Sequence, residues 1–399
     1  MASADLPEDR IVKEILIRVP VKSMVRFRCV CKLWNSLVSN PDFTRSQSNL
    51  SVSNNFDDDH IILNKRLPDS NLSIISRATL SETRINKVPY PAAIHADMHL
   101  VGSINGLVCV VCLSSLGYYF IIWNPATQIS KKILLLKKSW WPFKLEKDLW
   151  PCLLGFAWDH ISNDYKLIFD TMLSLSAVAY SCKTDSWSNV AVRWTRYWKD
   201  ARWSPSVIVK GIPYWNQSDE IIKFDAKINE FTYFSVPKRH VHYTLIDLNG
   251  CLGWIGYIRL GQYAFQLPDV YCFDEKNRIW SKRYIINIIA CLSCEPLSYP
   301  ICFKYGGEII FDERNILYDL KSGEIKRLCD PSVYLNGFSY TPSFLSLEGM
   351  EPFQEEALED WVVSKYQITF VMKRLLESYC ISTLFFLFCS FCSVLYFWN

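Results

Sequence analysis

The 399-residue chain lacks the short motifs that usually mark a catalytic site. It has no glycine-rich phosphate loop, no Gly-x-Ser-x-Gly turn and no His-Glu-x-x-His helix. None of its 15 cysteines has neighbours that would activate a nucleophile. Asp159, Asp225, Asp274 and Asp319 stand at expected turns, where aspartate caps the backbone. We therefore expect no catalytic residues, no enzyme activity and no cofactor.

Clustered basic charge is also scarce. The first 48 residues carry a net charge of +3, which equals the total for the chain, so the remainder is neutral. Nucleic-acid binding depends on clustered lysine and arginine, so we expect no nucleic-acid partner. A basic and aromatic stretch at residues 131–141 is interpreted as a solvated loop, with contact to an acidic partner or RNA as the alternative.

A metal site is not expected either. The chain begins without an apolar signal segment, so its N-terminal part is expected in a reducing compartment, cytoplasm or nucleus, where thiols stay free. Pairs with Cys-x-x-Cys spacing occur at residues 109–112, 291–294 and 389–392. The first pair lies in a strand-like run, where residues three apart point to opposite faces and do not share a metal easily.

Two helical runs open the chain. Apolar residues recur at helical spacing between Ile11 and Val19, and Pro20 ends this run. Ser23 is a candidate cap for a second run over residues 24–38, which ends at Asn40 and Pro41. About 40 residues are too few to close a core alone, and the runs carry more apolar side chains than one hidden face needs. A partner surface is the simplest explanation.

A family resemblance rests on these residues. Leu6-Pro7, Glu14-Ile15-Leu16, the segments 18–23 and 26–32, Trp34 and the closing segment 40–43 resemble the F-box of plant F-box proteins. The resemblance implies a helical domain at residues 1–45 that docks on a Skp-type adaptor and, through it, on a cullin scaffold with ubiquitin-transfer machinery. The alternative is a helical cap packed on its own chain. The implied adaptor-binding residues are Leu6, Pro7, Ile11, Ile15, Leu16, Val19, Pro20, Val21, Phe27, Val30, Cys31 and Trp34.

The composition changes after a polar linker at residues 46–59. From residue 60 to residue 347, short apolar runs are broken by glycine, proline, asparagine and aspartate, which predicts many short strands. Within this body a repeat occurs five times: an aromatic residue, a polar residue, and a closing residue six positions later. The repeats begin at Trp123, Tyr180, Phe224, Phe273 and Tyr318 and close at Ser130, Trp187, Phe231, Trp280 and Ile325.

The spacing of the repeat predicts the architecture. Intervals between the leading aromatics are 57, 44, 49 and 45 residues, close to the period of a β-propeller with four strands per unit. Residues 61–88 are a candidate for a further, divergent unit. The predicted fold is therefore α+β and multidomain: a small N-terminal helical F-box followed by a mostly antiparallel, propeller-like β body of five to six units. A sandwich is the alternative.

The body extends the resemblance. Segments 102–109, 123–127, 154–159, 162–166, 211–215, 247–252 and 279–282 look like the F-box-associated domain, a kelch-like interaction module that captures the protein to be ubiquitinated. The resemblance implies a non-catalytic, substrate-recognition subunit of a Skp–cullin–F-box ubiquitin ligase that binds an unknown target protein. The alternative is a propeller that binds a glycan or small ligand without a ligase role. Long inserts supply the candidate target-binding residues Trp140, Trp141, Trp150, Trp194, Trp198 and Trp203.

The C-terminal region differs from the body. Residues 348–377 are mixed in composition, and residues 378–398 contain no charge. The apolar tail is long enough for a membrane anchor, which would place the protein on a membrane surface. Its crowding in Phe, Ser, Cys and Leu fits read-through of a non-coding stretch equally well.

Overall fold

The structure is a computed structural model in which the chain divides into two compact units, residues 1–88 with 96–353, and residues 89–95 with 354–399. Only residues of the first unit are described below. They are residues 7–19, 21–40, 42–43, 46, 60–65, 72–76, 82–84, 97–114, 117–137, 151–171, 176–193, 206–217, 220–237, 242–248, 250–257, 269–285, 300–302, 308–311, 316–319, 322–327 and 334–352. No helix within these ranges has the length and apolar composition needed to cross a membrane.

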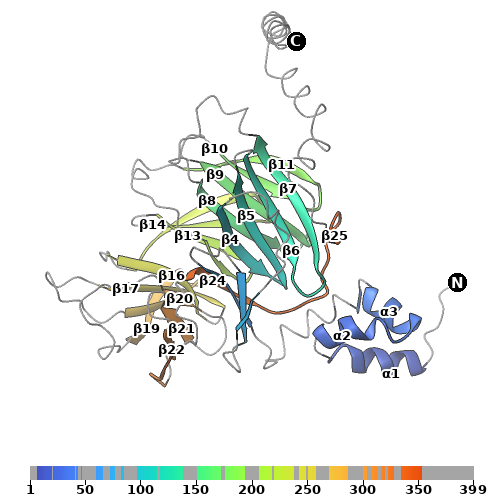
Figure 1. Cartoon of the computed structure of the whole chain (residues 1–399). Helices are drawn as coiled ribbons and strands as arrows, with labels where there is room; N and C mark the ends of the chain where they lie inside the picture. The colour runs from blue at the N-terminus through green and yellow to red at the C-terminus, as the bar shows by residue number, and fades with distance from the viewer. Residues whose placement is uncertain are drawn as a thin grey trace, which may run out of the picture. The chain divides into compact units, whose positions relative to one another are not determined.

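Three helices form the N-terminal part of the described chain: α1 (Pro7–Leu16), α2 (Val21–Phe27) and α3 (Lys32–Ser39) (Figure 1, blue). The prediction of one helical run over residues 24–38 is thus wrong, because residues 28–31 separate α2 from α3. Cys31 adopts an extended backbone, and its sulfur accepts a hydrogen bond from the Trp34 amide at 3.5 Å. Cys31 rather than Ser23 therefore caps a helix, and Ser23 lies inside α2.

The β body consists of short antiparallel strands. They are β1 (His60–Lys65), β2 (Leu72–Ser76), β3 (Glu82–Arg84), β4 (Asp97–Ile104), β5 (Leu107–Ser114), β6 (Gly117–Asn124), β7 (Ile129–Lys137), β8 (Pro151–Asp159), β9 (Asp164–Thr171), β10 (Ser176–Ser181), β11 (Ser186–Ala191), β12 (Val207–Val209), β13 (Ile212–Gln217), β14 (Glu220–Asp225), β15 (Glu230–Ser235), β16 (His242–Leu248), β17 (Cys251–Tyr257), β18 (Asp269–Asp274), β19 (Ile279–Ile285), β20 (Pro300–Cys302), β21 (Glu308–Phe311), β22 (Ile316–Asp319), β23 (Ile325–Arg327), β24 (Tyr334–Tyr340) and β25 (Glu351–Pro352). In β5 every residue from Leu107 to Cys112 is buried, as expected for a strand covered on both faces.

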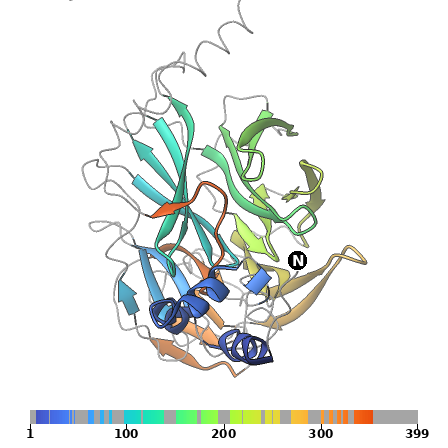
Figure 2. The ribbon, with the colours of Figure 1, turned by 90° about the vertical axis from the view of Figure 1, so that its right-hand side faces the viewer.

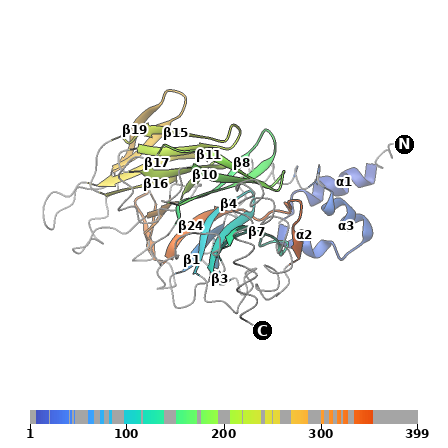
Figure 3. The same cartoon turned by 90° about the horizontal axis from the view of Figure 1, so that it is seen from above.

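The described strands form six sheets that follow one another along the chain. Neighbouring sheets touch in a closed series through one or two strands of each: β24 with β4, β4 with β8, β8 with β13, β12 with β16, β16 with β20, and β20 with β24. The late strand β24 completes the sheet of β1, β2 and β3, and it lies beside β1 in Figure 3. This arrangement is a β-propeller, and the expected extra unit at residues 61–88 is confirmed as the sheet that β24 closes.

The five-fold repeat is confirmed residue by residue. Each leading aromatic is the cross-strand partner of its predicted closing residue: Trp123 with Ser130, Tyr180 with Trp187, Phe224 with Phe231, Phe273 with Trp280, and Tyr318 with Ile325. The polar residue accepts a backbone hydrogen bond in the turn, at 2.9 Å from Lys227 to Asp225 and 3.0 Å from Ser322 to Asp319. The fourth turn residue is left-handed in every repeat, at Gln128, Asp185, Asn229, Arg278 and Gly323. Asx chemistry therefore builds the turns, as predicted.

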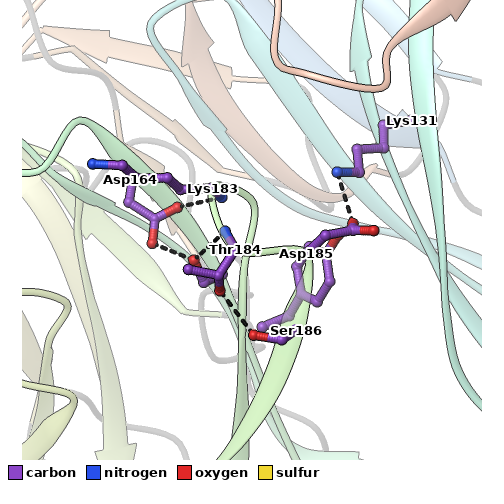
Figure 4. Close-up of polar contacts among 8 residues, drawn as sticks. Lys131, Asp164, Lys183, Thr184, Asp185 and Ser186 are labelled. Atoms are coloured by element: carbon purple, nitrogen blue, oxygen red, sulfur yellow. Dashed lines mark hydrogen bonds and ion pairs between the residues drawn. The ribbon is translucent and has the colours of Figure 1, made fainter.

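Two lysines, Lys166 and Lys131, link neighbouring sheets. The Lys166 ammonium donates to the Ala226 carbonyl at 2.5 Å and to Asn229 Oδ1 at 2.7 Å. Lys131 forms a 2.9 Å ion pair with Asp185 (Figure 4). The predicted solvated loop over residues 131–141 is therefore wrong at its start, since Lys131, Lys132 and Lys137 lie within β7.

Candidate functional site: an apolar face on the helical domain

The helical domain has a core of its own. Leu16, Val21, Met24, Val38 and Phe43 are buried together. Phe27 and Trp34 pack around them, with their ring centroids 5.3 Å apart. Leu16 and Val21, predicted to bind the adaptor, thus face inward, and their direct role is to hold the three helices together.

Four large apolar side chains remain outside this core. Ile11 is 60% exposed, Ile15 59%, Val30 62% and Leu33 43%. Ile11 and Ile15 are one helical turn apart, so they share a face of α1. Val30 precedes α3 and Leu33 lies in its first turn. Burying one such side chain is worth roughly 1.5–3 kcal/mol, so this surface favours an apolar partner. We call these four residues the exposed apolar face.

The other predicted adaptor-binding residues occupy intermediate places. Val19, Phe27 and Trp34 are half-buried against the helical core. Cys31 is exposed, and its sulfur is used as a helix cap. Pro7 begins α1, while Leu6, Pro20 and the Pro7 side chain lie outside the described atoms.

The helical domain also carries exposed basic side chains. Arg18, Arg26, Arg28 and Lys32 are all exposed on the same small domain. Arg18 pairs with Glu14 at 3.6 Å, and both side chains are mostly in solvent, so the pair adds little stability. A partner that adds acidic groups to an apolar contact would complement the exposed basic side chains of this domain.

The β body approaches the helical core from another side. Phe344, which follows β24, is 6% exposed and belongs to the same apolar cluster as Leu16 and Met24. Ala126, in the turn between β6 and β7, also packs on it. The helical domain therefore uses one side for contact with its own chain and leaves Ile11, Ile15, Val30 and Leu33 in solvent.

Three groups of the β body that could perform chemistry, Cys109, Cys112 and Asp159, are engaged in structure. Cys109 and Cys112 lie buried in β5, and burial raises the pKa of both thiols, that of Cys112 to about 12. The described ranges contain no group of three or more His, Cys, Asp or Glu side chains placed to hold a metal. The Asp159 carboxylate accepts from the Ile161 amide at 2.9 Å and the Ser162 hydroxyl at 2.5 Å, which is turn chemistry.

Sequence comparison agrees with this division of the chain. An F-box domain model matches residues 4–46, and an F-box associated beta propeller domain model matches residues 61–252. The chain is an F-box protein with an F-box-associated propeller domain. In general, an F-box joined to such a propeller indicates a non-catalytic protein that recruits substrates. The F-box of such a protein binds a Skp-type adaptor, and its propeller binds a target.

Relatives of this F-box protein occur in Arabidopsis thaliana. An F-box/kelch-repeat protein is 24% identical over 69% of this chain and 78% of its own length. Another F-box protein is 29% identical over 76% of this chain and 87% of its own. Among solved structures, an oligogalacturonate lyase in complex with manganese matches 67% of this chain and 83% of its own with a TM-score of 0.34 and 9% identity, too distant to bear on function.

Three residues on or against the helical domain were not predicted from the sequence as contact residues. Leu33 was placed in a helical run but not in the adaptor-binding set, although its side chain is exposed. Ala126 and Phe344, which touch the helical core, were not predicted as contacts at all. The six tryptophans predicted to bind the target, at residues 140, 141, 150, 194, 198 and 203, lie outside the described residues, so that prediction stands as made.

Proposed function

We propose that this F-box protein is the substrate-recognition subunit of a Skp–cullin–F-box ubiquitin ligase in the cytoplasm or nucleus. The F-box would dock on the Skp-type adaptor, and the propeller would hold a target protein for ubiquitination. One observation supports the docking step most: Ile11 and Ile15 are about 60% exposed on a helix whose other side already closes a core. Catalysis would then come from proximity, because the complex places a target lysine near a loaded ubiquitin carrier.

A matched pair of double variants tests the docking step. We expect the full chain carrying Ile11→Glu and Ile15→Glu to lose adaptor binding by at least about 100-fold, because two apolar contacts worth roughly 1.5–3 kcal/mol each are replaced by charge. The measurement is titration with a purified plant Skp-type adaptor by calorimetry.

The control introduces the same charges elsewhere. Ile161, in the turn between β8 and β9, and Ile279, at the start of β19, are each 61% exposed. Ile161→Glu with Ile279→Glu should leave adaptor affinity within about two-fold, since neither residue belongs to the exposed apolar face. Equal loss in both double variants, or no loss in either, would contradict docking through α1.

A further inference from the structure

The turn between the third and fourth strands differs in one sheet. In four of the five repeats, the second position after the polar residue is a lysine: Lys183, Lys227, Lys276 and Lys321. In the repeat of the β4–β7 sheet the same position is Ala126. Lys183, Lys227 and Lys276 are exposed. Ala126 instead is half-buried and packs on the helical core. At this turn position the chain therefore has a small apolar residue in place of the lysine found in the sibling turns. Among the described turns of the repeat, this is the one that contacts the helical core.

A second segment reaches the same place. Residues 341–350 connect β24 to β25, and we call them the strap (Figure 2, orange-red). The Asn124 amide nitrogen donates to the Ser343 carbonyl at 3.0 Å and to the Leu345 carbonyl at 2.8 Å. Successive residues of an extended segment point in opposite directions. Leu345 accordingly packs on the core between β5 and β9, and Phe344 enters the core of the helical domain.

The strap is fastened at both ends. The Ser343 hydroxyl donates to the Asn105 carbonyl at 2.6 Å. At the far end, Glu351 pairs with Ser130, so β25 adds a strand to the edge of β7. Asn124 is itself fully buried, and its side-chain oxygen accepts the Ala126 amide at 2.9 Å. One side chain therefore joins the turn that carries Ala126 to the segment that carries Phe344.

We propose that Asn124, Ala126 and Phe344 form an intramolecular docking seat that holds the F-box at one fixed position on the propeller. The expected consequence of this seat is that adaptor and target are kept at a set separation, and that consequence rests on the function proposed above. A fixed separation matters because proximity in a tethered complex depends on the geometry and stiffness of the connection. The contacts of the seat themselves do not depend on that function.

The test restores the residue that the chain uses elsewhere. Ala126→Lys is compatible with the turn, since three described sibling turns carry an exposed lysine at this position. Here the lysine side chain would replace Ala126 against the apolar cluster of the helical core. In the full chain we expect amide hydrogen exchange to accelerate by about ten-fold or more in the strap and in α2, with exchange in β8–β19 unchanged. Phe344→Ala should accelerate amide hydrogen exchange in the same regions.

The control is the reverse exchange in a sibling turn. Lys227→Ala removes an exposed lysine from the turn between β14 and β15 and should change neither exchange nor scattering. Small-angle X-ray scattering should show a larger radius of gyration for Ala126→Lys and Phe344→Ala than for the wild type or Lys227→Ala.

The two proposals can fail separately. Unchanged exchange in the strap and α2 in both seat variants, or equal acceleration throughout β8–β19, would overturn the seat. Adaptor titration reports on docking alone: Ala126→Lys should bind within about two-fold of the wild type, because the exposed apolar face is intact. A wild-type chain that binds no adaptor while the exchange result holds would refute the ligase function and leave the seat standing.

Discussion

We expect Leu16→Asp to unfold the F-box, whereas Ile15→Asp should leave it folded and remove only the proposed adaptor binding. The two residues are neighbours in sequence, yet Leu16 is 1% exposed and Ile15 is 59% exposed. A carboxylate at position 16 would sit among Val21, Met24 and Val38, a cost of several kcal/mol for so small a core. A carboxylate at position 15 would remain in water and cost only about 0.5 kcal/mol of helix propensity.

Amide hydrogen exchange across residues 7–43 distinguishes the two variants. Leu16→Asp should lose protection in all three helices, while Ile15→Asp should keep the wild-type pattern. Leu16→Met keeps the volume of the side chain and should lower the free energy of unfolding by less than about 1.5 kcal/mol. It therefore distinguishes the effect of a buried charge from that of any substitution at this position. Retained helix protection in Leu16→Asp would show that the described core does not hold this domain together.

We expect Gly155→Ala to destabilise the propeller strongly, although it adds a single methyl group. A Cβ at position 155 would lie 2.4 Å from Trp215 Cζ2, which is far closer than a carbon–carbon contact allows. Trp215 is 1% exposed, and its indole nitrogen donates to the Leu154 carbonyl at 2.9 Å across the junction of two sheets. Because the ring is buried in a core cluster and held by this hydrogen bond, we expect a loss of about 2–3 kcal/mol in the free energy of unfolding.

Removing the clashing ring should rescue the variant. Trp215→Phe deletes the outer atoms that the new methyl group meets, at its own cost in packing. In urea unfolding, the double variant should be at least about 1 kcal/mol more stable than the sum of the two single effects predicts. Additive effects would show that Gly155 is not required by the approach of Trp215.

The β body was largely predictable because its signals are local. Each repeat combines a strand end, an Asx turn and a returning strand within about ten residues, and turn chemistry of this kind is written in the nearby sequence. The pairings of Trp123 with Ser130 and of Phe224 with Phe231 follow directly from it. The break between α2 and α3 was missed, because residues 28–31 carry no glycine or proline and their apolar spacing continues through Val30.

The division of labour among the apolar residues of the F-box was not predictable from spacing. Ile15 and Leu16 both fit a helical apolar stripe, but only the packed domain decides which of them points inward. The seat was missed for another reason. Asn124 and Ser343 are 219 positions apart, so their contact exists only once the propeller has closed. The one local signal was the alanine at position 126 in place of the lysine of the sibling turns.

The most direct test of adaptor docking is a hydrogen-exchange footprint of the full chain with a purified Skp-type adaptor. We expect a one-to-one complex in which protection rises over residues 11–16 and 28–34, the segments that carry Ile11, Ile15, Val30 and Leu33, and in which β8–β19 are unaffected. Absence of a complex with a folded chain, or protection confined to the propeller, would contradict docking through the exposed apolar face.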